Sequence, residues 1–354
     1  MRNPVTAALD PLFWLHHCNI DRLWEVWNRS GGANTTSLNW INQTFDFFDI
    51  DGSPVTDVNN AVQDIESDLN FSYEFYPPRQ VEQQRRLWRT IGCLETLSPT
   101  FFSVTYGALG SQSEASIGIV KDMIAESHVE IAAHLTCLDK TPEEMQQTLN
   151  ILEQIGVSHI VALRGDRVVE QGKPIQGAYQ YAEQLVAQIA RDYSFDISVA
   201  AYPEIHPDAI SAQDDLDNLR RKFDAGATRA LTQYFYDCDS FLRFRDQAID
   251  AGIENMIVPG ILPIHDIDKI ISFSERCGAI VPNDVVEKFT SLKSEREESR
   301  PYAVAHCVYM CERLAKEGIN DFHFYTLNQS DLSYEVTRVL RGEIDVPESR
   351  MQAA

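Results

Sequence analysis

Two carboxylates in this sequence lie where short runs of β-branched and aromatic residues end. Glu74 lies in "FSYEFYP" (residues 71–77), and Asp166 closes "HIVALRGD" (159–166), two residues after Arg164. Alternate residues of a strand share a face, so Glu74 lies on the face of Ser72 and opposite its aromatic neighbours. One carboxylate among aromatic residues and one beside a guanidinium have environments that push their pKa values apart. This pattern predicts a general acid and an ionised partner that stabilises positive charge.

Polar residues also end the other short apolar runs. Each of them alone has an ordinary explanation, as a helix cap or a hydrogen-bonded core residue. Several runs that end this way indicate a site, because unpaired polar groups are costly to bury. The residues concerned are Thr105, Tyr106, His134, Thr136, Tyr202, Glu204, His206, Gln233 and Asn328.

A further group of residues is suited to a large planar cofactor that carries phosphate. Tyr106, Tyr181 and Tyr202 could line a flat ring system, and Arg221 with Lys222 could hold a phosphate group. No Ser-His-Asp elbow, nucleophilic cysteine motif or HxH or HxxxH pair is visible, so we assign no metal ligand. The residues alone therefore indicate an oxidoreductase or lyase with a bound cofactor such as a flavin.

The elements that must position these residues alternate regularly along the chain. Eight strand-like runs are separated by stretches with helical periodicity, such as 141–156, which has an N-cap at Thr141, Pro142 in the first turn and a stop at Gly156. Residues 211–226 form a second such stretch. This α/β alternation predicts a (β/α)8 TIM barrel with its chemistry at the carboxyl ends of the strands. An open doubly wound sheet is disfavoured, because neither GxGxxG nor GxxxxGK[ST] occurs.

The composition limits which kinds of partner and which cellular compartment we expect. A net charge of −23 disfavours nucleic acid and anionic membranes, which such a surface would repel. No apolar run approaches the ~18 residues that span a bilayer, and no secretion signal is visible at the N-terminus. Seven scattered cysteines without CxxC spacing favour reduced thiols. We therefore expect a cytoplasmic protein whose partners are small molecules.

Eight phrases in the sequence resemble the bacterial type of methylenetetrahydrofolate reductase. They are "FSYEFYPPR", "FFSVTYGA", "AAHLTC", "HIVALRGD", "DISVAAYPEIHPDA", "TRALTQYFYD", "IVPGILPI" and "DFHFYTLN", in this order, and the resemblance runs from about residue 62 to about 342. It implies a (β/α)8 barrel that holds FAD. The implied reaction moves a hydride from NAD(P)H to FAD and then to 5,10-methylenetetrahydrofolate, giving 5-methyltetrahydrofolate in a ping-pong scheme.

The resemblance also implies roles for individual residues. Glu74 would protonate the folate and open its five-membered ring, Asp166 would stabilise the cationic iminium, and Gln233 would contact both substrates. Thr105 would touch the nicotinamide. The implied FAD-binding residues are Tyr106, Ala108, His134, Arg164, Gly165, Asp166, Tyr181, Tyr202, His206, Asp215, Asn218, Arg221 and Lys222.

Two positions depart from the family pattern. Gln329 follows "TLN", where relatives commonly have Arg, and Ile267 lies where an aromatic residue is frequent. We expect both to alter KM before they alter the chemistry. Family members are usually oligomers, so we expect a homo-oligomer. Because the sequence ends soon after the barrel, we expect no control by S-adenosylmethionine.

The first sixty residues differ from the rest of the chain in composition and in sequence pattern. "DPLFWLHHCNID" resembles the second copper motif of tyrosinases, with His17 four residues before Asp21. A type-3 copper site needs six histidines, and residues 1–60 contain only His16 and His17. We therefore expect a non-functional fragment with one amphipathic helix that begins at Asp10 and Pro11, in a mostly irregular appendage. The expected division is 1–60 appendage, 61–345 flavin-binding barrel and 346–354 tail.

Three alternatives to the folate-reducing flavoenzyme stay open. One is another flavin-dependent barrel of the proline dehydrogenase type. A second is a copper-dependent phenol oxidase remnant, and a third is a degenerate barrel that only binds folate or flavin. The set Glu74, Asp166 and Gln233 favours the reductase, because ring opening needs a proton donor.

Overall fold

The structure is a computed structural model that describes residues 44–48, 54–58, 69–106, 111–138, 140–165, 179–293 and 296–346. The chain divides into two compact units, Met1–Ser67 and Asp68–Ala354. In the first unit, β1 (Thr44–Phe48) pairs antiparallel with β2 (Pro54–Val58). The Asn- and Thr-rich composition did not predict these two strands. The helix expected from Asp10 lies outside the described residues.

The second unit is a closed parallel barrel, as the alternation of runs predicted. Its strands follow the order β10-β3-β4-β5-β6-β7-β8-β9, so the first and last strands of the barrel pair and leave no sheet edge. The strands are β3 (Asn70–Phe75), β4 (Phe101–Val104), β5 (Glu130–Thr136), β6 (His159–Leu163), β7 (Asp196–Ala201), β8 (Arg229–Tyr234), β9 (Met256–Ile261) and β10 (Asp321–Tyr325).

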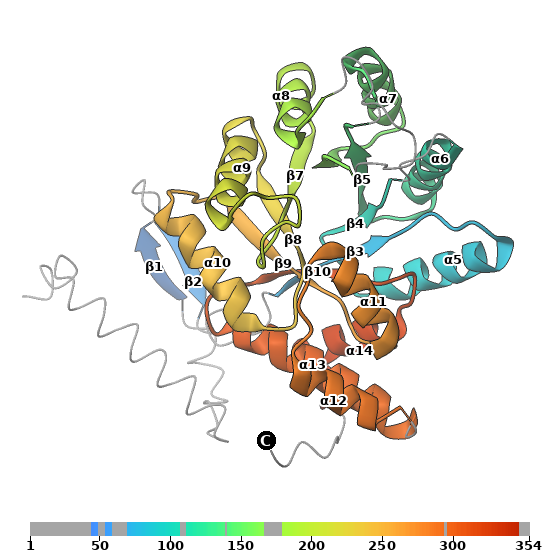
Figure 1. Cartoon of the computed structure of the whole chain (residues 1–354), viewed down its shortest axis with the longest axis vertical. Helices are drawn as coiled ribbons and strands as arrows, with labels where there is room; N and C mark the ends of the chain where they lie inside the picture. Colours follow the sequence, from blue (N-terminus) through green and yellow to red (C-terminus); the bar gives the residue numbers. More distant parts are fainter. Residues whose placement is uncertain are drawn as a thin grey trace, which may run out of the picture. The chain divides into compact units, whose positions relative to one another are not determined.

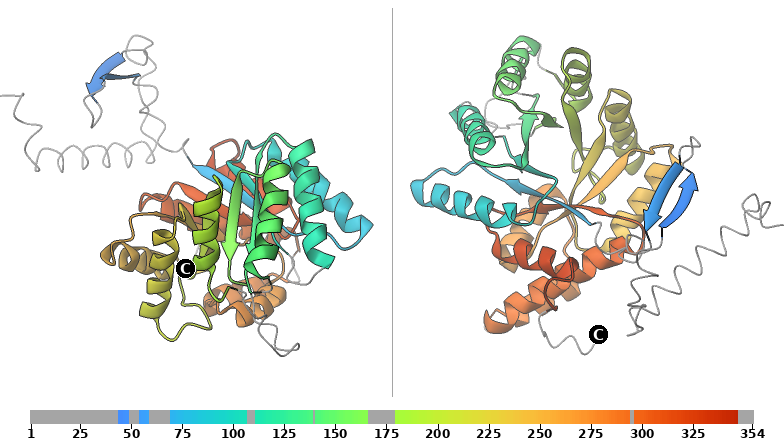
Figure 2. Two further views of the ribbon diagram at one scale, coloured as in Figure 1. Left: turned by 90° about the horizontal axis from the view of Figure 1, so that it is seen from above. Right: turned by 180° about the vertical axis from the view of Figure 1, so that it is seen from behind.

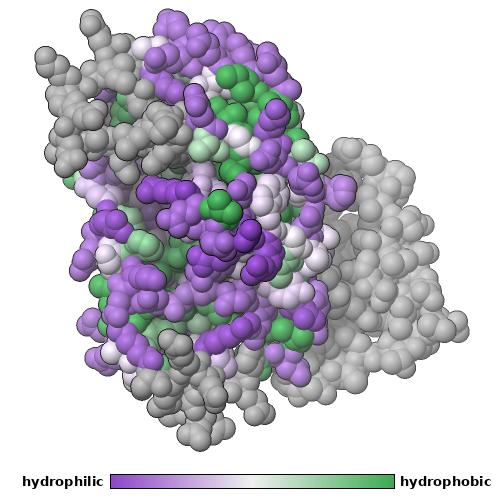
Figure 3. Space-filling view, turned by 90° about the vertical axis from the view of Figure 1, so that its right-hand side faces the viewer, coloured by the Kyte–Doolittle hydropathy of each residue, from purple (hydrophilic) through white to green (hydrophobic). Residues whose placement is uncertain are grey.

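Helices surround this barrel, and Figures 1 and 2 show them as an outer ring with the eight strands at the centre. None of the helices in the described part of the chain is long and apolar enough to span a membrane. Hydrophilic residues cover most of the described surface on the face drawn in Figure 3. The helices are α5 (Val81–Glu95), α6 (Ser111–Glu126), α7 (Pro142–Gln154), α8 (Ala182–Asp192), α9 (Ala212–Asp224), α10 (Cys238–Asp250), α11 (Ile267–Cys277), α12 (Asn283–Ser291), α13 (Arg296–Ala315) and α14 (Asp331–Leu340).

Local sequence signals fix the helix ends. The Thr141 hydroxyl accepts from the Glu144 amide at 3.3 Å, and the Glu144 carboxylate accepts from the Thr141 amide at 2.8 Å. This reciprocal pair is the predicted capping box of α7. Gly156 ends the segment with φ +91°, a conformation that side chains disfavour. Residues 211–226 behave in the same way, with a Ser211 cap and Gly226 at φ +120°.

Alternation along each strand separates an apolar layer from a polar one. The helix-facing side of β3 carries Phe71, Tyr73 and Phe75, all at most 1% exposed, and the Tyr73 hydroxyl lies 2.7 Å from Thr337 Oγ1 on α14. The opposite side carries Ser72 and Glu74 toward the barrel axis. Burial of the aromatic layer therefore determines that Glu74 points inward.

Candidate active site

A cavity of about 890 Å³ lies at the carboxyl ends of the barrel strands. This is where (β/α)8 enzymes carry their active sites, and the volume suits a small-molecule ligand. Eight residues singled out in the sequence line it: Glu74, Thr105, Tyr106, His134, Arg164, Tyr202, His206 and Gln233. They come from the ends of six consecutive strands, β3 to β8, and from the segments that follow them.

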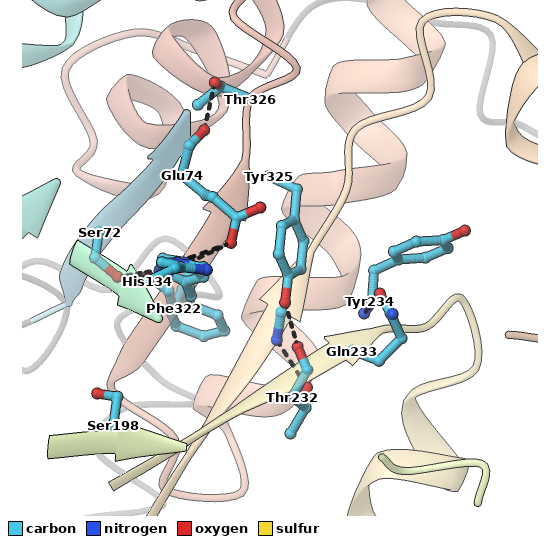
Figure 4. Close-up of polar contacts among 12 residues, drawn as sticks. Ser72, Glu74, His134, Ser198, Thr232, Gln233, Tyr234, Phe322, Tyr325 and Thr326 are labelled. Atoms are coloured by element: carbon cyan, nitrogen blue, oxygen red, sulfur yellow. Dashed lines mark hydrogen bonds and ion pairs between the residues drawn. The ribbon is translucent and has the colours of Figure 1, made fainter. Parts of the chain in front are cut away.

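Glu74 reaches the cavity wall from the polar side of β3. Its carboxylate Oε2 lies 3.5 Å from Nε2 of His134 on β5 and 3.7 Å from Nε2 of His323 on β10. Figure 4 shows the carboxylate pointing toward the His134 ring. The Glu74 side chain is 18% exposed, whereas the two histidines are buried. Two imidazoles therefore flank one carboxylate that still faces the cavity.

The histidines beside Glu74 are held without a full set of hydrogen bonds. Burial lowers the pKa of His134 to about 4, and the Glu74 charge offsets this shift only in part. His134 is therefore neutral at neutral pH. His323 Nδ1 lies 2.7 Å from the Ser72 hydroxyl, while Nε2 of both rings has no hydrogen-bond partner in the described part of the chain. Both Nε2 atoms are thus placed to exchange a hydrogen bond with the carboxylate.

The segment after β10 holds the end of β3 in place. Thr326 Oγ1 donates to the Glu74 backbone carbonyl at 2.7 Å. The Asn328 side-chain amide both accepts from Tyr76 N and donates to Tyr76 O, at 3.1 and 2.8 Å. Asn328, which the sequence suggested as a polar residue of the rim, is 1% exposed and does not line the cavity. Its role is to position the strand that carries Glu74.

An irregularity between β8 and β9 shapes the opposite wall. The register shifts between Leu231 and Tyr234, and the Tyr325 hydroxyl donates to the Thr232 carbonyl at 2.6 Å. A Cβ on Gly260 would lie 2.2 Å from that carbonyl oxygen and 2.6 Å from the Tyr325 ring, so only glycine fits there. Such irregularities re-aim side chains, and Gln233 faces the cavity.

The β4 to β7 side of the cavity is polar. Arg164 Nη2 pairs with Asp208 Oδ2 at 2.5 Å, and the Tyr202 and His206 rings meet edge to face at 4.5 Å. Burial and the nearby Arg164 lower the pKa of His206. The Tyr106 hydroxyl is buried and has no hydrogen-bond partner among the described residues. A buried hydroxyl left in this way beside a cavity is suited to a ligand that accepts or donates a hydrogen bond.

Other residues expected to bind the cofactor lie behind this wall. Gly165, with φ +88°, packs against Thr136. Asp215 Oδ2 accepts from His206 N at 2.8 Å, and Lys222 Nζ donates to the carbonyl of Ala200, a cavity residue, at 2.7 Å.

Three other residues expected to bind the cofactor, two on α9 and one at the start of α8, lie outside the cavity wall. Arg221 pairs with Glu183 at 3.0 Å and also bonds Asn218, and Tyr181 is 49% exposed at the start of α8. None of the three lines the cavity. Ala108 and Asp166 lie outside the described residues.

Several cavity residues were not predicted. Tyr325 lines the cavity from β10, and His323, which lies beside Glu74 without lining the cavity, shares its inward face, so strand alternation within "DFHFY" could have indicated both. Phe273 and Arg276 lie on a helix and carried no motif that would have indicated them. Ile267 is 3% exposed and does not line the cavity. Within the described ranges, no cluster of three His, Cys, Asp or Glu side chains could hold a metal ion.

Comparison with known proteins gives two family matches. The methylenetetrahydrofolate reductase family matches residues 58–341, and the common central domain of tyrosinase matches residues 1–30. Both resemblances noted in the sequence are thereby confirmed.

Individual relatives agree with the longer match. The 5,10-methylenetetrahydrofolate reductase of Escherichia coli K12 is 41% identical over 283 residues, which cover 80% of this chain and 94% of that protein. The Pectobacterium carotovorum enzyme of the same name is also 41% identical, over 289 residues. Methylenetetrahydrofolate reductase (NADH) 1 of Arabidopsis thaliana is 35% identical, and the match covers 46% of its length.

Among solved structures, a Clostridium thermocellum protein that binds 5-methyl-5,6,7,8-tetrahydrofolic acid superimposes with a TM-score of 0.55 at 14% identity. The match covers 80% of this chain and 99% of that one, and at this identity it supports the fold alone. The family match spans most of the chain and contains the whole of the cavity described above. The chain therefore belongs to the methylenetetrahydrofolate reductase family.

Proposed function

We propose that this protein reduces 5,10-methylenetetrahydrofolate to 5-methyltetrahydrofolate with NAD(P)H as hydride donor and FAD as cofactor. The observation that carries the proposal is the position of Glu74 in a member of this family. Its carboxylate faces a cavity that is otherwise rich in aromatic and apolar groups, with His134 and His323 beside it. A proton donor at such a place is what opening of the folate ring requires.

The residues of the cavity fit a flavin. The Tyr106 hydroxyl has no partner within the described structure, and Arg164 lies on the same wall. Lys222 and Asp215 lie immediately behind that wall. Donors, a guanidinium and an ammonium on one side of a cavity suit a planar ring that carries a pyrophosphate. When bound, FAD would accept a hydride from NAD(P)H and supply it to the folate.

Glu74 would give its proton to the folate nitrogen, and the C–N bond of the five-membered ring would break to leave a cationic iminium. The neutral His134 ring would then hold a hydrogen bond to the carboxylate that remains. Asp166 would stabilise the iminium by its negative charge. Gln233, which the β8 irregularity aims into the cavity, would orient the folate.

The two substrates would take turns in one half of the cavity, which is the structural basis of a ping-pong scheme. Thr105 would contact the nicotinamide, as the resemblance implies. The division of the chain at about residue 60, with a tyrosinase-like segment that takes no part in the reaction, belongs to the same proposal. So does a homo-oligomer of the barrel.

A spectroscopic titration without oxygen tests the proposal. The purified protein should show a visible flavin band near 450 nm, which NADH or NADPH should bleach. Addition of 5,10-methylenetetrahydrofolate should restore the band and give 5-methyltetrahydrofolate as product. A protein without the band, or one that proline bleaches and folate does not restore, would overturn it.

A further inference from the structure

One wall of the cavity is contributed by a helix that carried no sequence motif. Phe273, Arg276 and Cys277 of α11 line the cavity together with residues of β8 to β10. The Arg276 guanidinium carbon lies 5.0 Å from the centroid of the Phe273 ring. Its Nε donates to the Ser272 carbonyl at 3.2 Å. These two contacts hold the guanidinium at the cavity rim, so less conformational freedom would be lost when it binds a ligand.

The charges around the cavity make this arginine distinctive. The described residues that line it include two arginines, Arg164 and Arg276. Arg164 is already paired with Asp208, whereas Arg276 forms no ion pair with a described residue. The chain as a whole carries a net charge of −23, which opposes the approach of an anion. A guanidinium without an acidic partner at the mouth offsets that repulsion where a ligand enters.

The docking of α11 fixes where the guanidinium lies. Gly278 ends the helix with φ +78°, and a Cβ there would lie 2.9 Å from Pro207 Cγ. Two residues later, the Ile280 amide donates to the Glu204 carboxylate at 2.8 Å. The segment that follows β7 and the end of α11 are thus tied together. Arg276 is therefore part of a fixed rim.

We propose that Arg276 binds a carboxylate of the glutamate end of the folate substrate. This inference rests on the proposed function and names a binding residue for it. A folate carries, beyond its pterin, an aromatic ring followed by a glutamate with two carboxylates. Phe273 and Arg276 present an aromatic side chain followed by a cation, one helical turn apart on the same wall. A guanidinium matches the planar carboxylate by two parallel hydrogen bonds.

Other anionic ligands fit this position less well. The groups suited to the pyrophosphate of FAD, Arg164 and Lys222, belong to the β4 to β7 side of the cavity. In NAD(P)H a ribose, and no second aromatic ring, separates the nicotinamide from its pyrophosphate. Gln329, where relatives commonly have an arginine, is uncharged and does not line the cavity. On the substrate side of the cavity, Arg276 supplies a positive charge from a different position in the sequence.

The experiment compares Arg276→Gln with the wild-type holoenzyme in the two half-reactions. The probes are 5,10-methylenetetrahydrofolate with one and with three glutamates, and NADH. Arg85→Gln is the matched control, because it removes the same charge from an exposed site on α5 that does not line the cavity. A general effect of net charge would appear equally in both variants. Arg276→Lys keeps the charge but lacks the planar guanidinium that forms two parallel hydrogen bonds with a carboxylate.

In Arg276→Gln the KM for the folate should rise about tenfold, the size of a lost charge-assisted hydrogen bond. Flavin content and the dependence of flavin reduction on NADH concentration should stay at the wild-type values. Arg276→Lys should lie between the two, and Arg85→Gln should match the wild type. An unchanged KM for the folate overturns the proposal, and so does an equal loss of NADH affinity or a loss of flavin. A wild-type protein that fails to reduce the folate would instead contradict the proposed function.

Discussion

The two halves of the cavity are built in different ways. On the β4 to β7 side the lining groups are polar, and several are already bonded to neighbours, as Arg164 is to Asp208 and His206 is to Asp208 N. The β8 to β10 side carries the aromatic residues Tyr234, Phe273 and Tyr325, and the hydroxyl groups of Tyr234 and Tyr325 form hydrogen bonds. Glu74 lies between the two. This difference supports the proposal that the polar side holds the cofactor and the other side binds the two substrates in turn.

The aromatic side owes its shape to the register shift between β8 and β9. The Thr232 carbonyl accepts from the Tyr325 hydroxyl, while the Thr232 hydroxyl accepts from Gly260 N at 2.9 Å. Burial raises the pKa of Tyr325 well above its usual value, so its hydroxyl stays protonated and can donate. A hydrogen bond across three strands therefore makes this wall rigid. Variants on the two sides should separate the two half-reactions.

The largest expected effect is that of Glu74→Gln. Loss of the general acid should slow reduction of the folate by about 10³-fold, within the usual range for proton transfer. Flavin reduction by NADH should stay near the wild-type rate, because it needs no proton from Glu74. Stopped-flow measurement of each half-reaction checks this, with Glu82→Gln on the exposed face of α5 as control. Equal slowing of both half-reactions would contradict the division of the cavity.

Lys222→Met should act on the other side. Loss of a charge-assisted contact to phosphate should weaken flavin binding about 10- to 100-fold, while the KM for the folate in flavin-saturated enzyme should not change. Lys269→Met, at an exposed position of α11, is the control. Flavin content after dialysis measures the effect.

Lys222 should also make the flavin affinity depend on pH. Burial lowers the pKa of Lys222 to about 8, so the charged form is present below that pH and is lost above it. Wild-type flavin affinity should therefore fall as the pH rises through 8, and Lys222→Met should lack this fall. Fluorescence titration of the flavin at pH 7 and 9 tests it. A wild-type affinity independent of pH would remove Lys222 from the cofactor site.

Gly260→Ala should disturb the aromatic wall. The added methyl group would overlap Thr232 O and the Tyr325 ring, and overpacking of this kind costs about 1–3 kcal/mol of unfolding free energy. The KM for the folate should rise while flavin content holds. Gly92→Ala on α5, where a Cβ would meet nothing within 4 Å, is the matched control. Urea unfolding and steady-state kinetics give the two readouts, and loss of flavin alone would refute the assignment of this wall to substrates.

His306→Phe should remove an acid-sensitive contribution that lies away from the cavity. His306 is buried beside Tyr302 and Phe289, and burial lowers its pKa to about 4. The unfolded chain binds the proton first as pH falls, so this stability is full above about 6.5 and is lost toward pH 4. Between pH 7 and 5 the variant should lose about 2 kcal/mol less than the wild type. Urea unfolding at both pH values measures this, and parallel losses in the two proteins would count against it.

The smallest effect is expected from removal of residues 1–60. Flavin content and turnover should match those of the full chain, because all the described residues that line the cavity belong to the second unit. Absorbance at 450 nm and steady-state assays of both proteins check this. A truncated protein without flavin and activity would mean that the first unit belongs to the working fold.

Much of the barrel could be predicted from the sequence, because its signals are local. Strand alternation placed Glu74 opposite Phe71, Tyr73 and Phe75, and the capping box placed the start of α7. The run 71–77 extends two residues past the end of β3 at Phe75, since Pro77 cannot continue the strand ladder. Tyr181 and Arg221 were expected in the site on type and spacing, yet they lie outside the cavity. Spacing alone does not give the direction of a side chain.

Order along the chain, the faces of the strands and the ends of the helices were determined by the sequence itself, since period-two burial and helix capping act over a few residues. The surroundings of Glu74 were decided by the tertiary structure. His323 and Ser72 meet at a separation of 251 residues, and Tyr325 reaches Thr232 across 93. Arg276 joins the rim because α11 docks against the segment after β7. The contact between Ser72 and His323 exists only once β10 pairs with β3 and closes the barrel, and no local pattern encodes that closure.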